Sequence, residues 1–167
     1  MMRAANKFLF SIFGLVLLAC HSAGVRADEL PLSDGQLLYL PIYSSIWHGD
    51  RRSEQGEPTK SLMSALVSVR NTSLKTPIRV ISARYYSSEG VLLKEFIGTP
   101  REIAPMGTFE LFIEKKESEG GSGANFVIQW KSATPTNPPV VEAVHIDNQA
   151  GRPYSFITTA RVIRQEK

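Results

Sequence analysis

The chain has 167 residues, of which 43% are hydrophobic and 21% are charged. This length is typical of one domain that buries a substantial core, and it argues against several independent domains. There are 19 Lys and Arg residues against 16 Asp and Glu residues. That excess is too small for the sustained basic patch of a nucleic-acid-binding protein.

Residues 1–19 are predicted to form a signal peptide. Arg3 and Lys7 give a basic start, and FLFSIFGLVLLA at 8–19 is an uninterrupted run of apolar and small residues. The run is shorter than the roughly 20 residues that a membrane-spanning helix needs, and it fits the apolar core of a secretory signal. Without this segment 17 basic residues face 16 acidic ones, so the mature chain is nearly neutral.

A lipid anchor is predicted where the apolar run ends. LLAC at 17–20 resembles the lipobox of bacterial lipoproteins, which implies that Cys20 is lipidated on sulfur and becomes the new amino terminus. His21 follows in place of an acidic residue, as in lipoproteins that a two-membrane bacterium passes to its outer membrane. Two alternatives stay open: cleavage after Ala27, which gives a secreted or soluble periplasmic protein, and an uncleaved anchor. Cys20 is the only cysteine, so we expect no internal disulfide.

Residues 20–35 are predicted to be a flexible tether, because the segment is polar and rich in small residues. Residues 36–167 are predicted to form a single domain. Apolar and polar residues alternate there with the period of two that is typical of half-buried strands, and no helical period is sustained. Turn residues separate the strands. The predicted strands are 37–43, 62–70, 78–86, 91–97, 108–114, 124–131, 140–147 and 154–163.

About seven or eight such strands predict an all-β fold, an antiparallel immunoglobulin-like β-sandwich. The clearest alternation places Phe126, Ile128 and Trp130 on the buried face, opposite an inward set of Phe109, Leu111 and Ile113. Residues 68–97 and 104–114 also resemble small bacterial extracytoplasmic immunoglobulin-like domains. That resemblance implies a sandwich and leaves the function open.

A more specific resemblance covers most of the mature chain. Five segments in order resemble an uncharacterised bacterial exported family, the domain of unknown function 3124. This implies a bacterial, exported protein and supplies no activity. The segments are LYLPIYSSIWHGD (38–50), LVSVRNTS (66–73), GGSGANFVIQW (120–130), PPVVEAVHI (138–146) and SFITTARVI (155–163).

The glycine cluster at 120–123 is predicted to be a turn. A phosphate-binding loop needs a lysine and a Ser or Thr before a helix, whereas Gly123 is followed by alternating strand residues. We expect Gly120, Gly121 and Gly123 to take positive φ and reverse the chain. An anion site made by the backbone amides of this loop is the alternative.

The connection from Tyr43 to Pro58 holds the candidate ligand-binding residues. Aromatic and cationic side chains concentrate there, and long loops with such residues are where binding sites tend to form. The alternative is that Tyr43 and Trp47 only cover one end of the sandwich. The candidates are Tyr43, Trp47, His48, Arg51 and Arg52.

No catalytic or metal motif stands out. Glu142 and His145 fall on opposite faces of one strand, so we interpret His145 as a half-buried structural histidine. The histidines lack metal-ligand spacing, and no Gly-x-Ser-x-Gly elbow occurs. Ser44 or Ser122 could meet His48 or His145, yet nothing singles out a pair.

These observations predict a membrane-tethered binding or interaction module of the bacterial cell envelope that is not an enzyme and has no cofactor. It would be lipid-anchored and face the periplasm, with an envelope protein or a glycan as its partner and no nucleic acid. The leading alternative is a periplasmic copper-handling protein, and an unrecognised hydrolase comes third.

Overall fold

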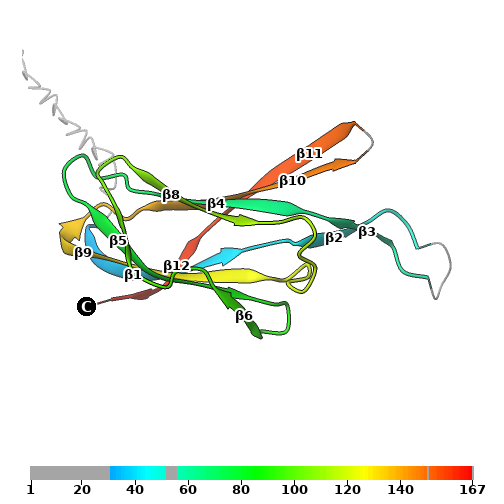
Figure 1. Cartoon of the computed structure of the whole chain (residues 1–167), viewed down its shortest axis with the longest axis horizontal. Helices are drawn as coiled ribbons and strands as arrows, with labels where there is room; N and C mark the ends of the chain where they lie inside the picture. The colour runs from blue at the N-terminus through cyan, green and yellow to red at the C-terminus, as the bar shows by residue number, and fades with distance from the viewer. Residues whose placement is uncertain (1–30, 52–55, 150, 167) are drawn as a thin grey trace, which may run out of the picture.

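The structure, a computed structural model, describes residues 31–51, 56–149 and 151–166. All the regular secondary structure in these ranges is β-strand, and each pair of neighbouring strands runs antiparallel. Two sheets pack face to face, as Figure 1 shows. The predicted antiparallel immunoglobulin-like β-sandwich is therefore confirmed, although the described residues form 12 strands, more than the seven or eight expected.

The larger sheet has six strands, and the first strand of the described residues lies inside it. Its order is β12 (Arg161–Gln165), β1 (Ser33–Pro41), β9 (Asn125–Thr136), β5 (Ile78–Tyr86) and β6 (Leu92–Glu95), with β7 (Arg101–Ile103) also paired to β5. β1 begins two residues before the end of the predicted tether, because Ser33 already pairs with Thr136 of β9.

The smaller sheet has four strands, and a separate hairpin extends beyond both sheets (Figure 1). The order in the smaller sheet is β11 (Arg152–Thr159), β10 (Val140–Gln149), β4 (Ser64–Arg70) and β8 (Thr108–Ile113). The hairpin consists of β2 (Ser45–His48) and β3 (Thr59–Leu62).

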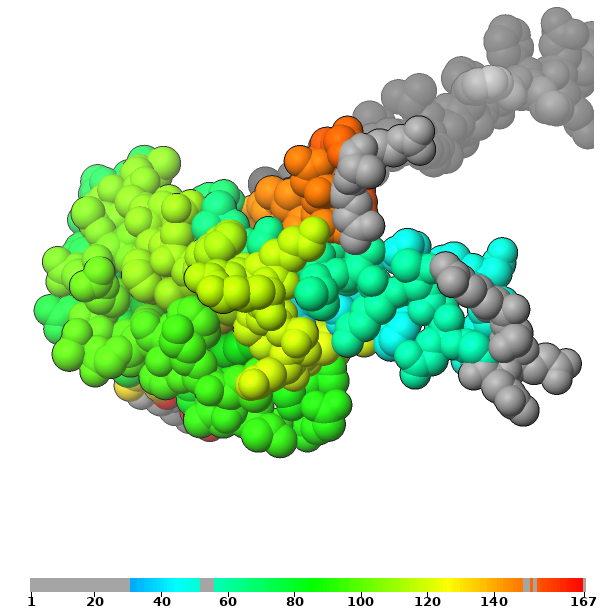
Figure 2. Space-filling view, turned by 45° about the vertical axis from the view of Figure 1, so that its right-hand side comes forward, coloured from blue at the N-terminus to red at the C-terminus, as the bar shows by residue number. Residues whose placement is uncertain are grey.

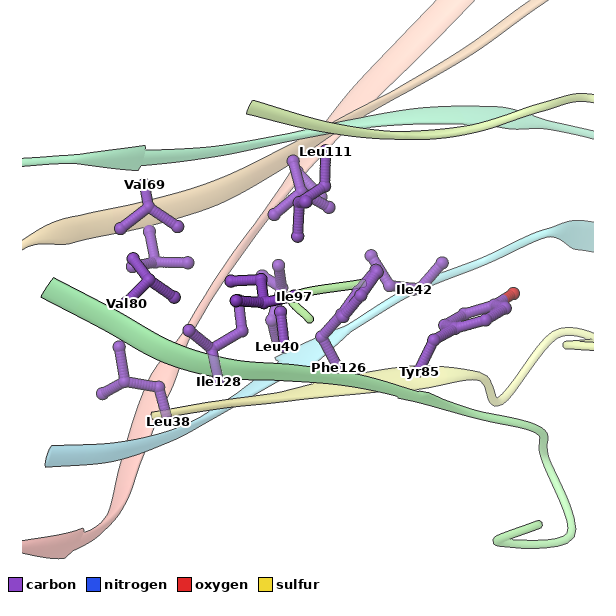
Figure 3. Packing of buried hydrophobic residues seen from close by; sticks show 14 of the residues in the cluster. Leu38, Leu40, Ile42, Val69, Val80, Tyr85, Ile97, Leu111, Phe126 and Ile128 are labelled. Atoms are coloured by element: carbon purple, nitrogen blue, oxygen red, sulfur yellow. The ribbon is translucent and has the colours of Figure 1, made fainter. Parts of the chain in front are cut away.

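The core lies between the sheets, where alternate residues of each strand meet (Figure 3). Phe126, Ile128 and Trp130 of β9 have no exposed surface, and Leu111 and Ile113 of β8 face them from the other sheet. Phe109 is partly buried against the same cluster. The predicted inward faces of β8 and β9 are confirmed. The Trp130 Nε1–H donates to Gln36 Oε1 at 3.3 Å, so the buried indole has a polar partner.

One predicted strand, 154–163, proves to be two. Ala160 divides it into β11, which belongs to the smaller sheet, and β12, which belongs to the larger one. The amide of Ala160 still donates to the Val141 carbonyl oxygen at 2.9 Å, before β12 leaves to pair with β1. The chain therefore joins the two sheets along this side of the sandwich.

The glycine cluster is a turn between β8 and β9, as predicted. Of its glycines only Gly121 has a positive φ, of 76°. Gly120 is needed for close approach instead, because a Cβ there would lie 1.9 Å from the Tyr85 hydroxyl oxygen. That hydroxyl donates to Glu117 Oε2 at 2.7 Å. Burial and the neighbouring Glu117 carboxylate raise the pKa of Tyr85, so the hydroxyl remains a donor.

Candidate functional site

The β2–β3 hairpin carries two of the predicted binding residues, Trp47 and His48. Its two strands pair only with each other among the described strands, and the hairpin extends beyond both sheets (Figure 1). Trp47 consequently keeps 45% of its surface exposed. The Nζ of Lys60, on the opposite strand, lies 5.6 Å from the centroid of the indole ring, within reach of a cation–π contact.

Tyr43 lies at the base of this hairpin, against the inner face of the β10–β11 hairpin. Its ring packs edge-on against His145 and Phe156, with centroids 5.8 and 5.5 Å away. Its backbone N–H donates to His145 Nε2 at 3.1 Å. Tyr43 does cover one end of the fold, yet 36% of its surface remains exposed.

His145 is fully buried, which corrects the interpretation of a half-buried residue. Phe156 stacks on the imidazole with centroids 4.6 Å apart, and Tyr43 covers its edge. Burial lowers the pKa of His145 to about 4, although the nearby carbonyl groups of Ala143 and Phe156 oppose the shift. The ring is therefore neutral near pH 7.

The proton of this neutral ring is on Nδ1, because Nε2 accepts a hydrogen bond from Tyr43. Nδ1 is buried and has no hydrogen-bond partner in the part of the chain that the structure describes. His145 therefore acts as an aromatic spacer that positions the Tyr43 backbone, and it is poorly placed to exchange protons with solvent.

Asp147 is a second buried polar residue at this end, one that sequence reasoning did not select. Its carboxylate contacts the Lys115 ammonium and accepts a hydrogen bond from the Tyr154 hydroxyl at 3.1 Å. Burial alone would raise its pKa, but these partners outweigh it and hold the pKa below its usual range. The alternation on β10, which places Asp147 on the face of His145, was the available signal.

Glu142 lies on the other face of β10, as expected. Its Oε2 accepts from Arg70 Nη1 at 2.6 Å, on the outside of the smaller sheet. It is therefore separated from His145 by the strand itself, and the two cannot act as an acid–base pair.

The other predicted residues are less closely tied together. His48 Nε2 lies 2.8 Å from the hydroxyl oxygen of Ser61 on β3. Arg51 is exposed, and Arg52 and Cys20 lie outside the described residues. Ser44 uses its hydroxyl to donate to the Gly121 carbonyl oxygen at 3.0 Å, so it is committed to joining two loops.

The glycine turn and the hairpin share one end of the fold. The amides of Ile42 and Ser44 donate to the carbonyl oxygens of Ala124 and Gly121, at 2.8 and 3.1 Å. Two amides of the glycine turn itself already have partners within the fold. Gly120 N–H donates to Glu117 Oε1, and Gly123 N–H donates to the Ser88 hydroxyl, so neither is free to bind an anion. The turn therefore supports the base of the hairpin.

Two further features are absent from residues 31–51, 56–149 and 151–166: a cluster of metal ligands and a membrane-spanning helix. No group of three or more His, Cys, Asp or Glu side chains is placed to hold a metal ion there. In the same residues there is no helix whose length and hydropathy would carry it across a bilayer.

The combined site is the hairpin end: the β2–β3 hairpin, Tyr43 at its base, and the inner face of the β10–β11 hairpin. Figure 2 shows the two hairpins as separate projections, in orange and in cyan to blue-green. The structure thus brings Tyr43, Trp47, His48 and His145 to one end of the molecule, over a rigid base. What this end presents to solvent is aromatic and cationic surface from Trp47, Tyr43 and Lys60.

Comparison with known proteins gives a family and no activity. No curated protein matches the chain. A solved structure, described as the crystal structure of Thermotoga maritima 1070, is 11% identical with a TM-score of 0.42, covering 78% of this chain and 97% of that one. The family described as Protein of unknown function (DUF3124) matches residues 35–163. Since that match spans the whole sandwich from β1 to β12, the chain belongs to this family of unknown function.

Proposed function

We propose that the protein is a binding module of the bacterial cell envelope and that its hairpin end contacts the partner. The observation that carries the proposal is the exposure of Trp47 on a hairpin that extends beyond both sheets. A large aromatic side chain contributes nothing to the core from that position. Exposed Trp and Tyr side chains beside cationic groups are typical of contact surfaces.

The chemistry of the hairpin end favours a partner with flat or acidic surface. Trp47 and Tyr43 offer flat apolar area, and Lys60 beside the indole and Arg51 offer positive charge, with the exposed carboxylates of Asp50 and Glu57 on the same hairpin. An envelope protein with exposed carboxylates, or a glycan whose sugar rings stack on the indole, fits this combination. The buried contacts of Tyr43 with His145 and Phe156 hold the base rigid, which limits the entropy lost on binding.

The module would be held at a membrane by a lipid on Cys20 and would face the periplasm. The outer membrane is favoured over the inner membrane. This part of the proposal rests on the LLAC pattern and on the apolar run before it. Labelling with a clickable fatty acid should mark the wild-type protein and not Cys20→Ser. A mature, unlipidated amino terminus at Asp28 would contradict the anchor.

Crosslinking in intact envelopes, followed by identification of the attached molecule, tests the binding proposal. Trp47→Ala should abolish a specific crosslink formed by the wild-type protein. The matched control is Leu74→Ala, which truncates another exposed apolar side chain, 78% exposed, on the β4–β5 connection. Equal capture by wild-type protein and both variants would contradict a role for the hairpin end.

A further inference from the structure

The two long sides of the sandwich differ. On one side the chain passes directly from β11 to β12 through Ala160 and so joins the sheets. On the other side the smaller sheet ends at β8 and the larger sheet ends at β6 and β7. The chain also crosses between the sheets there, from β7 to β8 through residues 104–107, but no described strand pairs with the outer edge of β8. This open side carries residues coloured green to yellow-green in Figure 2.

β8 has a free hydrogen-bonding edge on the open side. It pairs with β4 without a register shift, and Asn71 N–H donates to the Gly107 carbonyl oxygen at the start of the ladder. Because hydrogen-bonded and non-hydrogen-bonded pairs alternate, the backbone groups of Phe109, Leu111 and Ile113 face β4. Those of Thr108, Glu110 and Phe112 face away, toward solvent, and can pair with another strand.

Two hollows run beside this edge, with volumes of about 700 and 560 Å³. Both are lined by Phe96 and Phe112, so the two hollows lie next to each other between β8 and the β6–β7 connection, and together they are called the groove. Phe112 is 56% exposed, and Phe96 and Phe109 are only partly buried. Phe96 and Phe109 therefore offer apolar surface to side chains that point between the sheets, whereas Phe112 lies with Glu110 on the outer face of β8.

The cations along the groove have partners, whereas the carboxylate of Glu110 has no ion-pair partner among the described residues. Each nearby cation is already engaged: Lys116 with Glu114, Arg101 over the Phe109 ring and Lys94 over the Phe96 ring. Glu110, on the outer face of β8, takes part in no ion pair with any described residue. Its one recorded contact is the Ser68 hydroxyl at 3.5 Å.

We propose that β8 receives an extended peptide as an added antiparallel strand, with apolar side chains in the groove and a basic side chain opposite Glu110. The free backbone groups supply hydrogen bonds, and the groove and Glu110 supply the sequence preference. A second copy of this chain fits poorly, because pairing β8 with itself about Glu110 would set two glutamates opposite each other. This site is separate from the hairpin end and does not rest on the function proposed there.

Binding of short synthetic peptides to the full chain in mild detergent tests the proposal. The probe alternates valine and threonine over seven residues, with lysine replacing the central threonine, and carries a fluorophore for polarisation measurements. One control peptide has glutamate in place of the lysine. A second control is methylated on the amide nitrogens of the lysine and the threonines, which are the ones that would face β8.

We expect the lysine peptide to bind and the methylated peptide not to bind. Glu110→Lys should weaken the lysine peptide about tenfold and gain affinity for the glutamate peptide, since opposite charges across a strand pair stabilise it and like charges do not. Glu89→Lys, an exposed glutamate on the β5–β6 turn, should change neither affinity. Because both side chains are exposed, each variant should retain the far-ultraviolet spectrum of the wild type.

Three results would overturn the proposal. The first is no binding of the lysine peptide at millimolar concentration. The second is equal binding of the methylated peptide, which would mean attraction without strand addition. The third is a concentration-dependent dimer that protects the amides of Glu110 and Phe112 from exchange, which would make a second copy the occupant. The effect of Trp47→Ala on the crosslink has no bearing on these three results. Either proposal can therefore fail while the other stands.

Discussion

The two tryptophans of the chain occupy strands of opposite kinds. Trp130 is on β9, whose inner face is covered by the smaller sheet, and it has no exposed surface. Trp47 is on β2, which pairs only with β3 among the described strands, and it is 45% exposed. The residue type is the same, and the difference is that Trp130 points into the core between the two sheets whereas Trp47 lies on a hairpin that extends beyond them. The body of the sandwich is committed to stability, and the hairpin end is free for contact.

The largest expected effect is that of Trp130→Ala. Removing a fully buried indole should lower the free energy of unfolding by about 3–5 kcal/mol, which is a large part of the stability of such a domain. Urea denaturation followed by circular dichroism measures this loss. A loss below about 1 kcal/mol would mean that β9 does not pack as described.

Gly120→Ala should have the next largest effect, about 3 kcal/mol, at the support of the hairpin base. The added methyl group would overlap the Tyr85 hydroxyl, which is held in the core by its contact with Glu117. Gly98→Ala is the matched control, because a Cβ there meets no atom within 4 Å. Thermal melts of the two variants should separate clearly, and equal melting temperatures would contradict the tight approach.

Acid should loosen the junction between Tyr43 and the β10–β11 hairpin. The pKa of His145 is about 4 in the fold, below its ordinary value of 6.5, so the unfolded chain binds the extra proton first as pH falls. Stability is complete above about pH 6.5 and should decrease by on the order of 2 kcal/mol between there and about pH 4.5.

Asp147 and Glu95 do not account for that window. The pKa of each carboxyl is lowered in the fold, so the stability each contributes is lost only as pH falls below its ordinary value, 3.8 or 4.5. In His145→Gln, which keeps an acceptor for Tyr43 N–H and cannot titrate, the slope between pH 6.5 and 4.5 should flatten. An unchanged slope would assign the effect to another group.

The smallest expected effect on stability is that of Trp47→Ala. A half-exposed side chain on a hairpin outside the two packed sheets should change the free energy of unfolding by less than about 0.5 kcal/mol. Differential scanning calorimetry beside Trp130→Ala gives the comparison directly. If Trp47→Ala unfolds the protein instead, the indole covers the end of the sandwich and the hairpin end loses its leading contact residue.

The sequence was most informative where local pattern and tertiary burial agree. Strict alternation around Phe126 and Leu111 predicted which side chains face inward, because a strand in a sandwich has one covered face. β2, β3 and β7 were missed, since strands of three or four residues show almost no alternation of their own. β7 forms because β5 offers it an edge, which is a property of the assembled sheet.

The hairpin end could be predicted only in part. The aromatic and basic composition of 43–52 singled out a segment that contains Tyr43 and β2. However, the packing of Tyr43 on His145 joins residues far apart in the chain, and so does the pairing of Lys115 with Asp147. Such contacts depend on which strands become neighbours, and no short-range pattern encodes that order.

The position of β1 has a consequence for the order in which the protein can fold. β1 is the first strand of the described residues, yet its two neighbours in the sheet are β9 and β12, which begin at Asn125 and Arg161. No described strand synthesised between β1 and β9 pairs with β1. The larger sheet must therefore remain open until nearly the whole domain has been synthesised, and contacts of such long sequence separation make folding slow.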